Sequence, residues 1–156
     1  MAETDLPIEP QFVFRALTDS NEIEHWWGAD NVYRMTNWRA DLRPGGNYSV
    51  AVRTPDGQIF PASGKFIEIE FPNKIVHTRI YNWDHPTLGR RETIIHYQLD
   101  PIPSGTHLKV IHEGFTESSE AAIEHAEGWK RVLRWLYKHS YYNFYFPKKN
   151  AVKSPS

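Results

Sequence analysis

The sequence predicts an α+β fold: a curved antiparallel sheet of about six to seven strands around a long C-terminal helix, with two short helices near the N-terminus. Three features of the 156-residue chain support this prediction. Apolar residues recur at helical spacing before residue 28, alternate with a period of two from about 36 to 113, and return to helical spacing from about 117 to 143. The length suits one domain, which we place at residues 1–146.

The two short helices are marked by signals at their ends. Helical spacing over about 9–18 is carried by three apolar residues, Val13, Phe14 and Leu17. Asp19 followed by Glu22 is a capping-box pattern, which starts a second helix. Gly28 is suited to end that helix, because glycine accepts the left-handed backbone conformation common after a helix C-terminus.

Six segments with strand periodicity follow. Pro-Gly-Gly at 44–46 and Pro-Asp-Gly at 55–57 predict the turns between the first three. Pro61 lacks an N–H, so we expect its strand to be an edge strand or to be bulged there. The fourth segment, NKIVHTRIYNWDH at 73–85, leaves one choice open. Either its odd-numbered residues, including His77 and Arg79, face the long helix, or its even-numbered residues do.

The C-terminal helix carries a broad apolar stripe. Its members are Trp129, Val132, Leu133, Leu136, Tyr137 and Ser140. This stripe must be buried, and the concave face of a twisted sheet is the available partner. Gly128 costs ~1 kcal/mol relative to Ala inside a helix, and close packing against a strand is the simplest reason for it. The polar segment 147–156 is expected to be disordered.

Composition excludes several classes of function. The chain has 18 Lys and Arg against 19 Asp and Glu, which argues against a nucleic-acid or membrane partner. It has no cysteine, so thiolate catalysis and thiolate metal ligation are excluded. Signal-peptide and membrane-span patterns are missing, and we expect a cytoplasmic protein. The eight histidines lack metal-ligand spacing, and no phosphate loop or nucleophile elbow occurs, so we expect no metal or other cofactor.

Four motifs occur in order along the chain: FRALTDSNEIEHWWG, DLRPGGNYSV with PDG after it, IHEGF and EGWKRVLRWL. With them the chain resembles the bacterial activator-of-heat-shock-protein-90-ATPase-homologue-like domains of the START-like, helix-grip (SRPBCC) superfamily. The resemblance covers about residues 8–143 and implies a cavity between the sheet and the C-terminal helix. It implies no particular ligand or activity, because members of a fold family differ in both.

The chain departs from this family in two places. Only MAETDL precedes the first helix region, so the first strand is expected to be short or truncated. Its loss would leave an open strand edge, so monomer and homodimer both stay open. The second departure is on the fourth segment, where many relatives have cavity-facing aromatic residues and this chain has His77 and Arg79.

In the register that the resemblance implies, polar and aromatic side chains face the cavity. The expected ligand-binding residues are Arg79, His77, Tyr81, Tyr97, Tyr48, His112, Trp27, Trp129 and Leu133. A buried Arg79 would need Glu92, Glu113 or a ligand carboxylate as its partner. One residue of the Trp26–Trp27 pair is expected to fill the junction between helices and sheet, while the other could cover the cavity mouth.

Three functions remain open. The first is a non-enzymatic protein that binds a small apolar or aromatic molecule, whose carboxylate Arg79 would hold. The second is an enzyme of the cyclase, aromatase or hydrolase type, with His77 or His112 as weak candidates for the general acid or base. The third is a co-chaperone-type interaction module, which the family resemblance suggests.

Overall fold

The computed structural model describes residues 1–115 and 119–145. The elements in these ranges are β1 (Ala2–Leu6), α1 (Pro10–Thr18), α2 (Ser20–Trp26), β2 (Gly28–Ala29), β3 (Tyr33–Ala40), β4 (Asn47–Arg53), β5 (Ile59–Glu70), β6 (Lys74–Tyr81), β7 (Thr93–Ile102), β8 (Gly105–Glu113) and α3 (Ser119–Tyr145). The tail predicted to be disordered, 147–156, lies outside the described residues.

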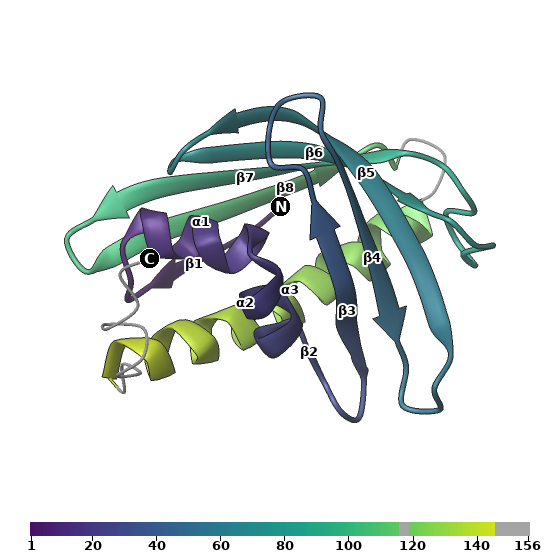
Figure 1. Cartoon of the computed structure of the whole chain (residues 1–156), viewed down its shortest axis with the longest axis horizontal. Coiled ribbons are helices and arrows are strands. Elements are labelled where there is room, and N and C mark those ends of the chain that lie inside the picture. The colour runs from purple at the N-terminus through teal and green to yellow at the C-terminus, as the bar shows by residue number, and fades with distance from the viewer. Residues whose placement is uncertain (116–118, 146–156) are drawn as a thin grey trace.

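The strands form one antiparallel sheet in the order β1-β8-β7-β6-β5-β4-β3-β2. Figure 1 shows this sheet curving around α3. Of the two short helices, α1 packs against β7 and β8, while α2 packs against β3 and α3. This is the predicted helix-grip architecture. The six segments with strand periodicity correspond to β3 through β8, and the sheet gains β1 and the two-residue β2.

The first strand is short, with five residues. Each residue of β1 pairs with β8, from Ala2 opposite Val110 to Leu6 opposite Thr106. His107 of β8 adds side-chain contacts, with Nδ1 2.6 Å from Asp5 Oδ1 and Nε2 3.5 Å from Glu3 Oε2. Hydrogen bonding to Asp5 raises the pKa of His107. The strand therefore pairs with β8 from Thr106 to Val110, so this part of β8 is not left as an open edge.

Pro61 lies where β5 extends past the end of β6. The first β5–β6 pair is Ala62 opposite Tyr81, and the Pro61 carbonyl accepts a hydrogen bond from Asn82 N just beyond it. The missing N–H of Pro61 therefore breaks no ladder bond. Our expectation of an edge strand or a bulge at Pro61 was wrong, because β5 lies between β4 and β6 and pairs regularly with β4 at this residue. The irregularity in β5 lies elsewhere, between Phe66 and Glu68.

The short helices begin and end at the predicted signals. α1 starts with Pro10, whose missing N–H costs nothing in a first turn. The Asp19 side chain caps α2 by accepting from Asn21 N at 2.8 Å. Gly28 follows the C-cap Trp27 with φ of 134°, and a Cβ there would lie 2.2 Å from Tyr33 O. Only glycine fits this position, because the backbone of β3 passes so closely.

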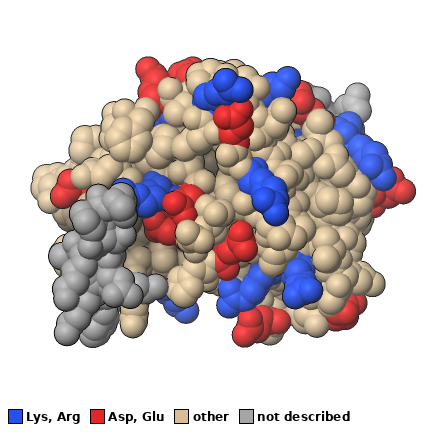
Figure 2. All heavy atoms as spheres, in the orientation of Figure 1, with Lys and Arg blue, Asp and Glu red and all other residues tan. Residues whose placement is uncertain are grey.

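The long helix packs its stripe into the concave side of the sheet. Trp129, Val132 and Leu136 are all buried in the common core. Gly128 contradicts our expectation of close packing, because a Cβ there would meet nothing within 4 Å. It borders an open space between α3 and the sheet. None of the described helices is long and apolar enough to cross a membrane. Figure 2 shows acidic and basic side chains interspersed on one face of the molecule.

Candidate functional site

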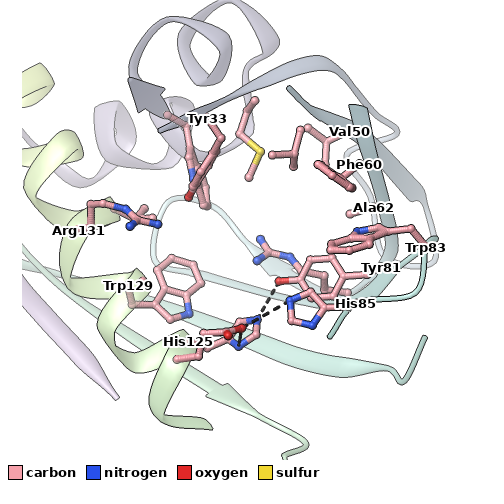
Figure 3. A pocket seen from close by; sticks show the side chains of 17 residues that line it. Tyr33, Val50, Phe60, Ala62, Tyr81, Trp83, His85, His125, Trp129 and Arg131 are labelled. Atoms are coloured by element: carbon pink, nitrogen blue, oxygen red, sulfur yellow. Dashed lines mark hydrogen bonds and ion pairs between the residues drawn. The ribbon is translucent and has the colours of Figure 1, made fainter. Parts of the chain in front are cut away.

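A cavity of about 330 Å³ lies between the sheet and α3. This volume is at the lower end of the range of small-molecule sites, about 300–1,000 Å³. Figure 3 shows its aromatic wall, with Tyr33, Phe60, Tyr81 and Trp83 around the space and Trp129 on the helix side. The remaining lining residues are Trp27, Met35, Val50, Val52, Ala62, Arg79, His85, Glu124, His125, Gly128, Arg131 and Val132.

The strand register explains which side chains reach this space. Ala62 of β5 is opposite both Val50 of β4 and Tyr81 of β6, so these three share one face of the sheet. Arg79 is two residues from Tyr81 and therefore faces the same way. The choice left open by the sequence is settled: Arg79 and Tyr81 line the cavity. The even-numbered face of β6 is also largely buried at Val76, which is why polarity alone could not decide.

Arg79 carries an unpaired positive charge in this cavity. Its guanidinium carbon lies 6.0 Å from the ring centroids of both Trp27 and Trp129. Burial acts to lower the pKa of Arg79, but the nearby phenols of Tyr48, Tyr81 and Tyr97 outweigh this and raise it, so the group stays charged. No carboxylate of the described residues forms an ion pair with Arg79. Glu113, one expected partner, instead accepts from His96 Nε2 at 3.1 Å.

Three of the expected ligand-binding residues lie deeper than the cavity. His77 is buried, and its Nδ1 donates to Thr78 O at 2.9 Å. Burial and the charge of Arg79 lower its pKa to about 3. Tyr48 donates its hydroxyl to the same carbonyl at 2.8 Å, and its ring lies edge-on to His77 at 4.8 Å. Burial raises the pKa values of Tyr48 and of Tyr97. These residues form a floor under Arg79, and none of them lines the main cavity.

His112 lies behind Trp129, outside the cavity lining. Its Nδ1 accepts from Trp129 Nε1 at 3.0 Å, so in the neutral ring Nε2 carries the proton and donates to Thr93 Oγ1 at 2.8 Å. Burial and the charge of Arg79 lower the pKa of His112 to about 2. Both ring nitrogens are thus engaged in hydrogen bonds, Nδ1 with Trp129 and Nε2 with Thr93. This arrangement argues against His112 as a general acid or base.

Leu133 requires a correction, because it does not line the cavity. It is buried on the side of α3 that packs against β1, beside Ala2. Residues advance by about 100° around a helix, so Leu133 and Val132 lie on opposite flanks of Trp129. The apolar stripe is wider than the cavity, and only the Val132 flank borders it.

The two adjacent tryptophans have different places. Trp27 is buried, at 4% exposure, and is part of the cavity wall instead of a lid over its mouth. Trp26 is buried at the junction between the short helices and the sheet, where its Nε1 donates to Ala16 O at 2.8 Å.

A hydrogen-bonded pair of Tyr81 and His125 reaches the cavity from opposite sides (Figure 3). His125 Nδ1 lies 2.8 Å from Ala121 O, which can only accept, so Nδ1 carries the proton. His125 Nε2 is then free to accept from the Tyr81 hydroxyl at 2.8 Å. Burial lowers the pKa of His125, and the charge of Arg79 acts in the same direction. The pair is therefore neutral, with its tautomer set by the helix backbone.

His85, Glu124 and His125 have ligand atoms within 4.8 Å of one another and are the one potential metal cluster among the described residues. His85 Nδ1 accepts from the backbone N–H groups of Thr87 and Leu88, each at 3.2 Å. Its proton is therefore on Nε2, which points at Glu124 Oε1 3.5 Å away. A metal on Nε2 would require a proton on Nδ1, where two N–H groups already converge. This geometry favours a hydrogen-bonded cluster over a metal centre.

Several lining residues were missed at the sequence level. His125 could have been found, because it stands four residues before Trp129 and extends the helical stripe by one turn. Trp83 continues the odd-numbered face of β6 beyond its last residue. His85 had no usable signal, since it lies in the irregular segment between β6 and β7. Arg131 is a polar residue beside the apolar stripe and has the pattern of an exposed position.

The fold and site together define a helix-grip domain with an open cavity between sheet and helix. Residues 7–140 match the family model described as activator of Hsp90 ATPase homolog 1-like protein. The chain belongs to this family. No curated protein matches it in sequence.

Solved bacterial structures share the fold. A protein from Chromobacterium violaceum is 22% identical, with a TM-score of 0.76 over 89% of this chain and 94% of that one. The AHSA1 protein from Silicibacter pomeroyi is 21% identical, with a TM-score of 0.72 over 88% and 94%. An AHSA1-like protein from Aeromonas hydrophila is 23% identical, with a TM-score of 0.68 over 86% and 89%. At these identities the likeness supports the fold alone.

Proposed function

We propose that this protein is a cytoplasmic, non-enzymatic binding protein for a small hydrophobic or aromatic carboxylic acid. The observation that carries the proposal is Arg79, a guanidinium in an aromatic-walled cavity with no carboxylate partner among the described residues. A charge in such a place favours a ligand that supplies the missing anion. The planar guanidinium can form two parallel hydrogen bonds with a carboxylate.

The apolar part of the ligand has matching surroundings. Trp27 and Trp129 flank Arg79, and Phe60 and Trp83 pack together with ring centroids 4.5 Å apart farther along the wall. Rings of this kind bury large areas and stack favourably on aromatic ligands. Val50, Val52 and Ala62 complete an apolar surface on the sheet side. The cavity therefore suits an acid whose carboxylate is attached to a ring or a short alkyl chain.

Calorimetric titration with matched acids and amides tests the proposal. Benzoate, phenylacetate and hexanoate should bind more tightly than benzamide, phenylacetamide and hexanamide. A hydrogen bond to a charged group contributes about 1.5–3 kcal/mol, so Arg79→Gln should weaken acid binding by about tenfold to a hundredfold. Arg43→Gln is the control, since Arg43 lies on the surface with its side chain 74% exposed. Equal binding of acids and amides, or no binding of either, would contradict the proposal.

The Tyr81–His125 pair supports a second candidate, an enzyme of the hydrolase type. His125 borders the same cavity as Arg79, and its unprotonated Nε2 accepts from the Tyr81 hydroxyl, so it would act as a general base by taking the proton of that hydroxyl. His77 and His112 lack this access. Release of p-nitrophenol from p-nitrophenyl acetate and hexanoate should exceed the buffer rate and fall in His125→Gln. A rate equal to buffer, or one unchanged by His125→Gln, would exclude this candidate.

The co-chaperone hypothesis predicts an exposed apolar patch and a cavity too small for a ligand. The cavity of about 330 Å³ favours ligand binding over it, while the exposed aromatic side chains of Tyr141, Tyr142 and Phe144 on α3 fit its first condition. Monomer and homodimer remain alternative proposals for the assembly, which sedimentation velocity would distinguish.

A further inference from the structure

The buried hydrogen-bonding groups around the cavity are unbalanced toward donors. Among the described residues, four buried side-chain polar atoms lack a hydrogen-bond partner: Trp27 Nε1, Trp83 Nε1, Arg131 Nε and Ser140 Oγ. The first three belong to residues that line the cavity, and all three are N–H groups. These donors are already shut off from water in the free protein, so a ligand atom that accepts from one of them would recover a hydrogen bond that the fold leaves unmade. The wall therefore selects for ligands with several acceptor atoms.

Arg131 is the strongest of these donors. It projects from α3 toward the cavity (Figure 3), with its guanidinium carbon 5.5 Å from the ring centroid of Tyr33 and 5.4 Å from that of Trp135. The two rings hold the side chain by cation–π contacts. No carboxylate of the described residues forms an ion pair with Arg131. It is thus a second guanidinium on the cavity wall whose charge has no carboxylate partner among the described residues.

The cavity wall contains one acidic residue, which is already occupied. Glu124 Oε1 lies 3.5 Å from His85 Nε2 and 3.4 Å from Thr87 Oγ1. The lining therefore has two guanidinium groups, Arg79 from β6 and Arg131 from α3, against one engaged carboxylate. The two cations come from opposite sides of the space, one from the sheet and one from the helix. A ligand with a single carboxylate would leave one of them without a counter-ion.

We propose that the ligand of this cavity is a dicarboxylic acid with an apolar or aromatic middle part, and that Arg131 binds its second carboxylate. This inference rests on the proposed function, since it takes the first carboxylate to be held by Arg79. The middle part contacts apolar residues of the lining, including Val50 and Val52. Each guanidinium presents a planar set of donors that fits a carboxylate in bidentate geometry. Trp27 and Trp83, which belong to the same lining, each have an indole N–H without a hydrogen-bond acceptor.

The test compares each diacid with its own monomethyl ester by calorimetric titration. The pairs are terephthalate, isophthalate and adipate with their monomethyl esters, which keep the length and one carboxylate but lose the second charge. In the wild type, at least one diacid should bind tenfold or more tightly than its monoester. Arg131→Gln should bring the ratio of diacid to monoester affinity close to one. Arg131→Lys keeps the charge but lacks the planar pair of guanidinium donors, and it should give an intermediate ratio. Arg134→Gln, an exposed arginine on the same helix outside this cavity, should leave the ratio unchanged.

The outcomes separate this inference from the proposed function. If every monoester binds as tightly as its diacid, and does so through Arg79, the dicarboxylate assignment is overturned and the monoacid proposal stands. A diacid preference that survives in Arg131→Gln would also overturn the assignment. Failure of diacids and monoesters alike to bind would overturn both. Circular dichroism and a thermal melt of each variant confirm that the comparison is made between folded proteins.

Discussion

Replacing Arg79 by methionine should leave the protein as stable as the wild type or make it more stable. Methionine keeps a long, flexible side chain that fills the same space beside Trp27 and Trp129. It removes a charge for which the described residues supply no counter-ion. We therefore expect that Arg79 serves ligand binding and lowers the free energy of unfolding relative to an apolar residue at the same position.

The magnitude follows from opposing contributions. Loss of two cation–π contacts costs about 1–2 kcal/mol, and loss of hydrogen bonding to the Tyr48 hydroxyl costs about 1.5–3 kcal/mol. Against this, removing an ion that is half-buried on the cavity wall recovers a comparable amount of desolvation free energy, on the order of several kcal/mol. We expect the free energy of unfolding to change by about 0 to +2 kcal/mol. For a domain of this size that is a rise in Tm of up to about 8 °C.

Urea unfolding at pH 7, followed by tryptophan fluorescence, measures this change directly. Arg43→Met is the control for loss of an arginine on the surface and should lie within about 0.5 kcal/mol of the wild type. A loss of more than about 2 kcal/mol in Arg79→Met, with the control unchanged, would refute the reasoning. Arg79 would then be a structural anchor for the tyrosine floor, and the main argument for an acid-binding cavity would fail.

Three further substitutions, at two positions, test the cavity and its floor. Gly128→Ala should raise the free energy of unfolding by up to about 1 kcal/mol in urea titrations, because a Cβ there meets nothing and alanine favours the helix. Gly128→Leu should fold normally by circular dichroism yet weaken benzoate binding tenfold or more, and unchanged affinity would contradict our placement of the ligand. His77 has a pKa of about 3 in the folded protein against about 6.5 unfolded. It therefore contributes stability that is complete above about pH 6.5 and is lost as pH falls toward 3, by up to about 1.4 kcal/mol per pH unit. His77→Phe should show a shallower fall in unfolding free energy between pH 6 and 4, and an identical slope would show that His77 is not the titrating group.

Local signals were sufficient for most of the elements. Asp19 and Gly28 mark the limits of α2 because capping and positive φ depend on a few neighbouring residues. The strands β3 to β8 follow from period-two alternation and from glycine turns. Short elements were the exception. β2 has two residues, too few to show any period, and β1 is defined by its pairing with β8, about a hundred residues away in the chain.

The site was predicted less completely than the fold. Arg79, Tyr81, Trp27 and Trp129 line the cavity as expected, because each follows from the register of one strand or one helix. His77, Tyr97, Tyr48 and His112 share the inward direction but lie beneath or behind the lining. Parity gives the face of the sheet on which a side chain lies, while its depth depends on the curvature of the sheet and on the size of its neighbours.

The sequence by itself determined the order of the elements, the near-neutral charge, the absence of thiol chemistry and the family resemblance, because composition and short-range patterns carry these properties. Only the tertiary structure decided that Tyr81 meets His125, 44 residues away, and that Arg131 stands across the cavity from Arg79. Only the tertiary structure also showed that Gly128 faces open space, where we had expected close packing against a strand. Such facts depend on how strongly the sheet curves around α3, which is a sum over many distant contacts and is not encoded in any single segment.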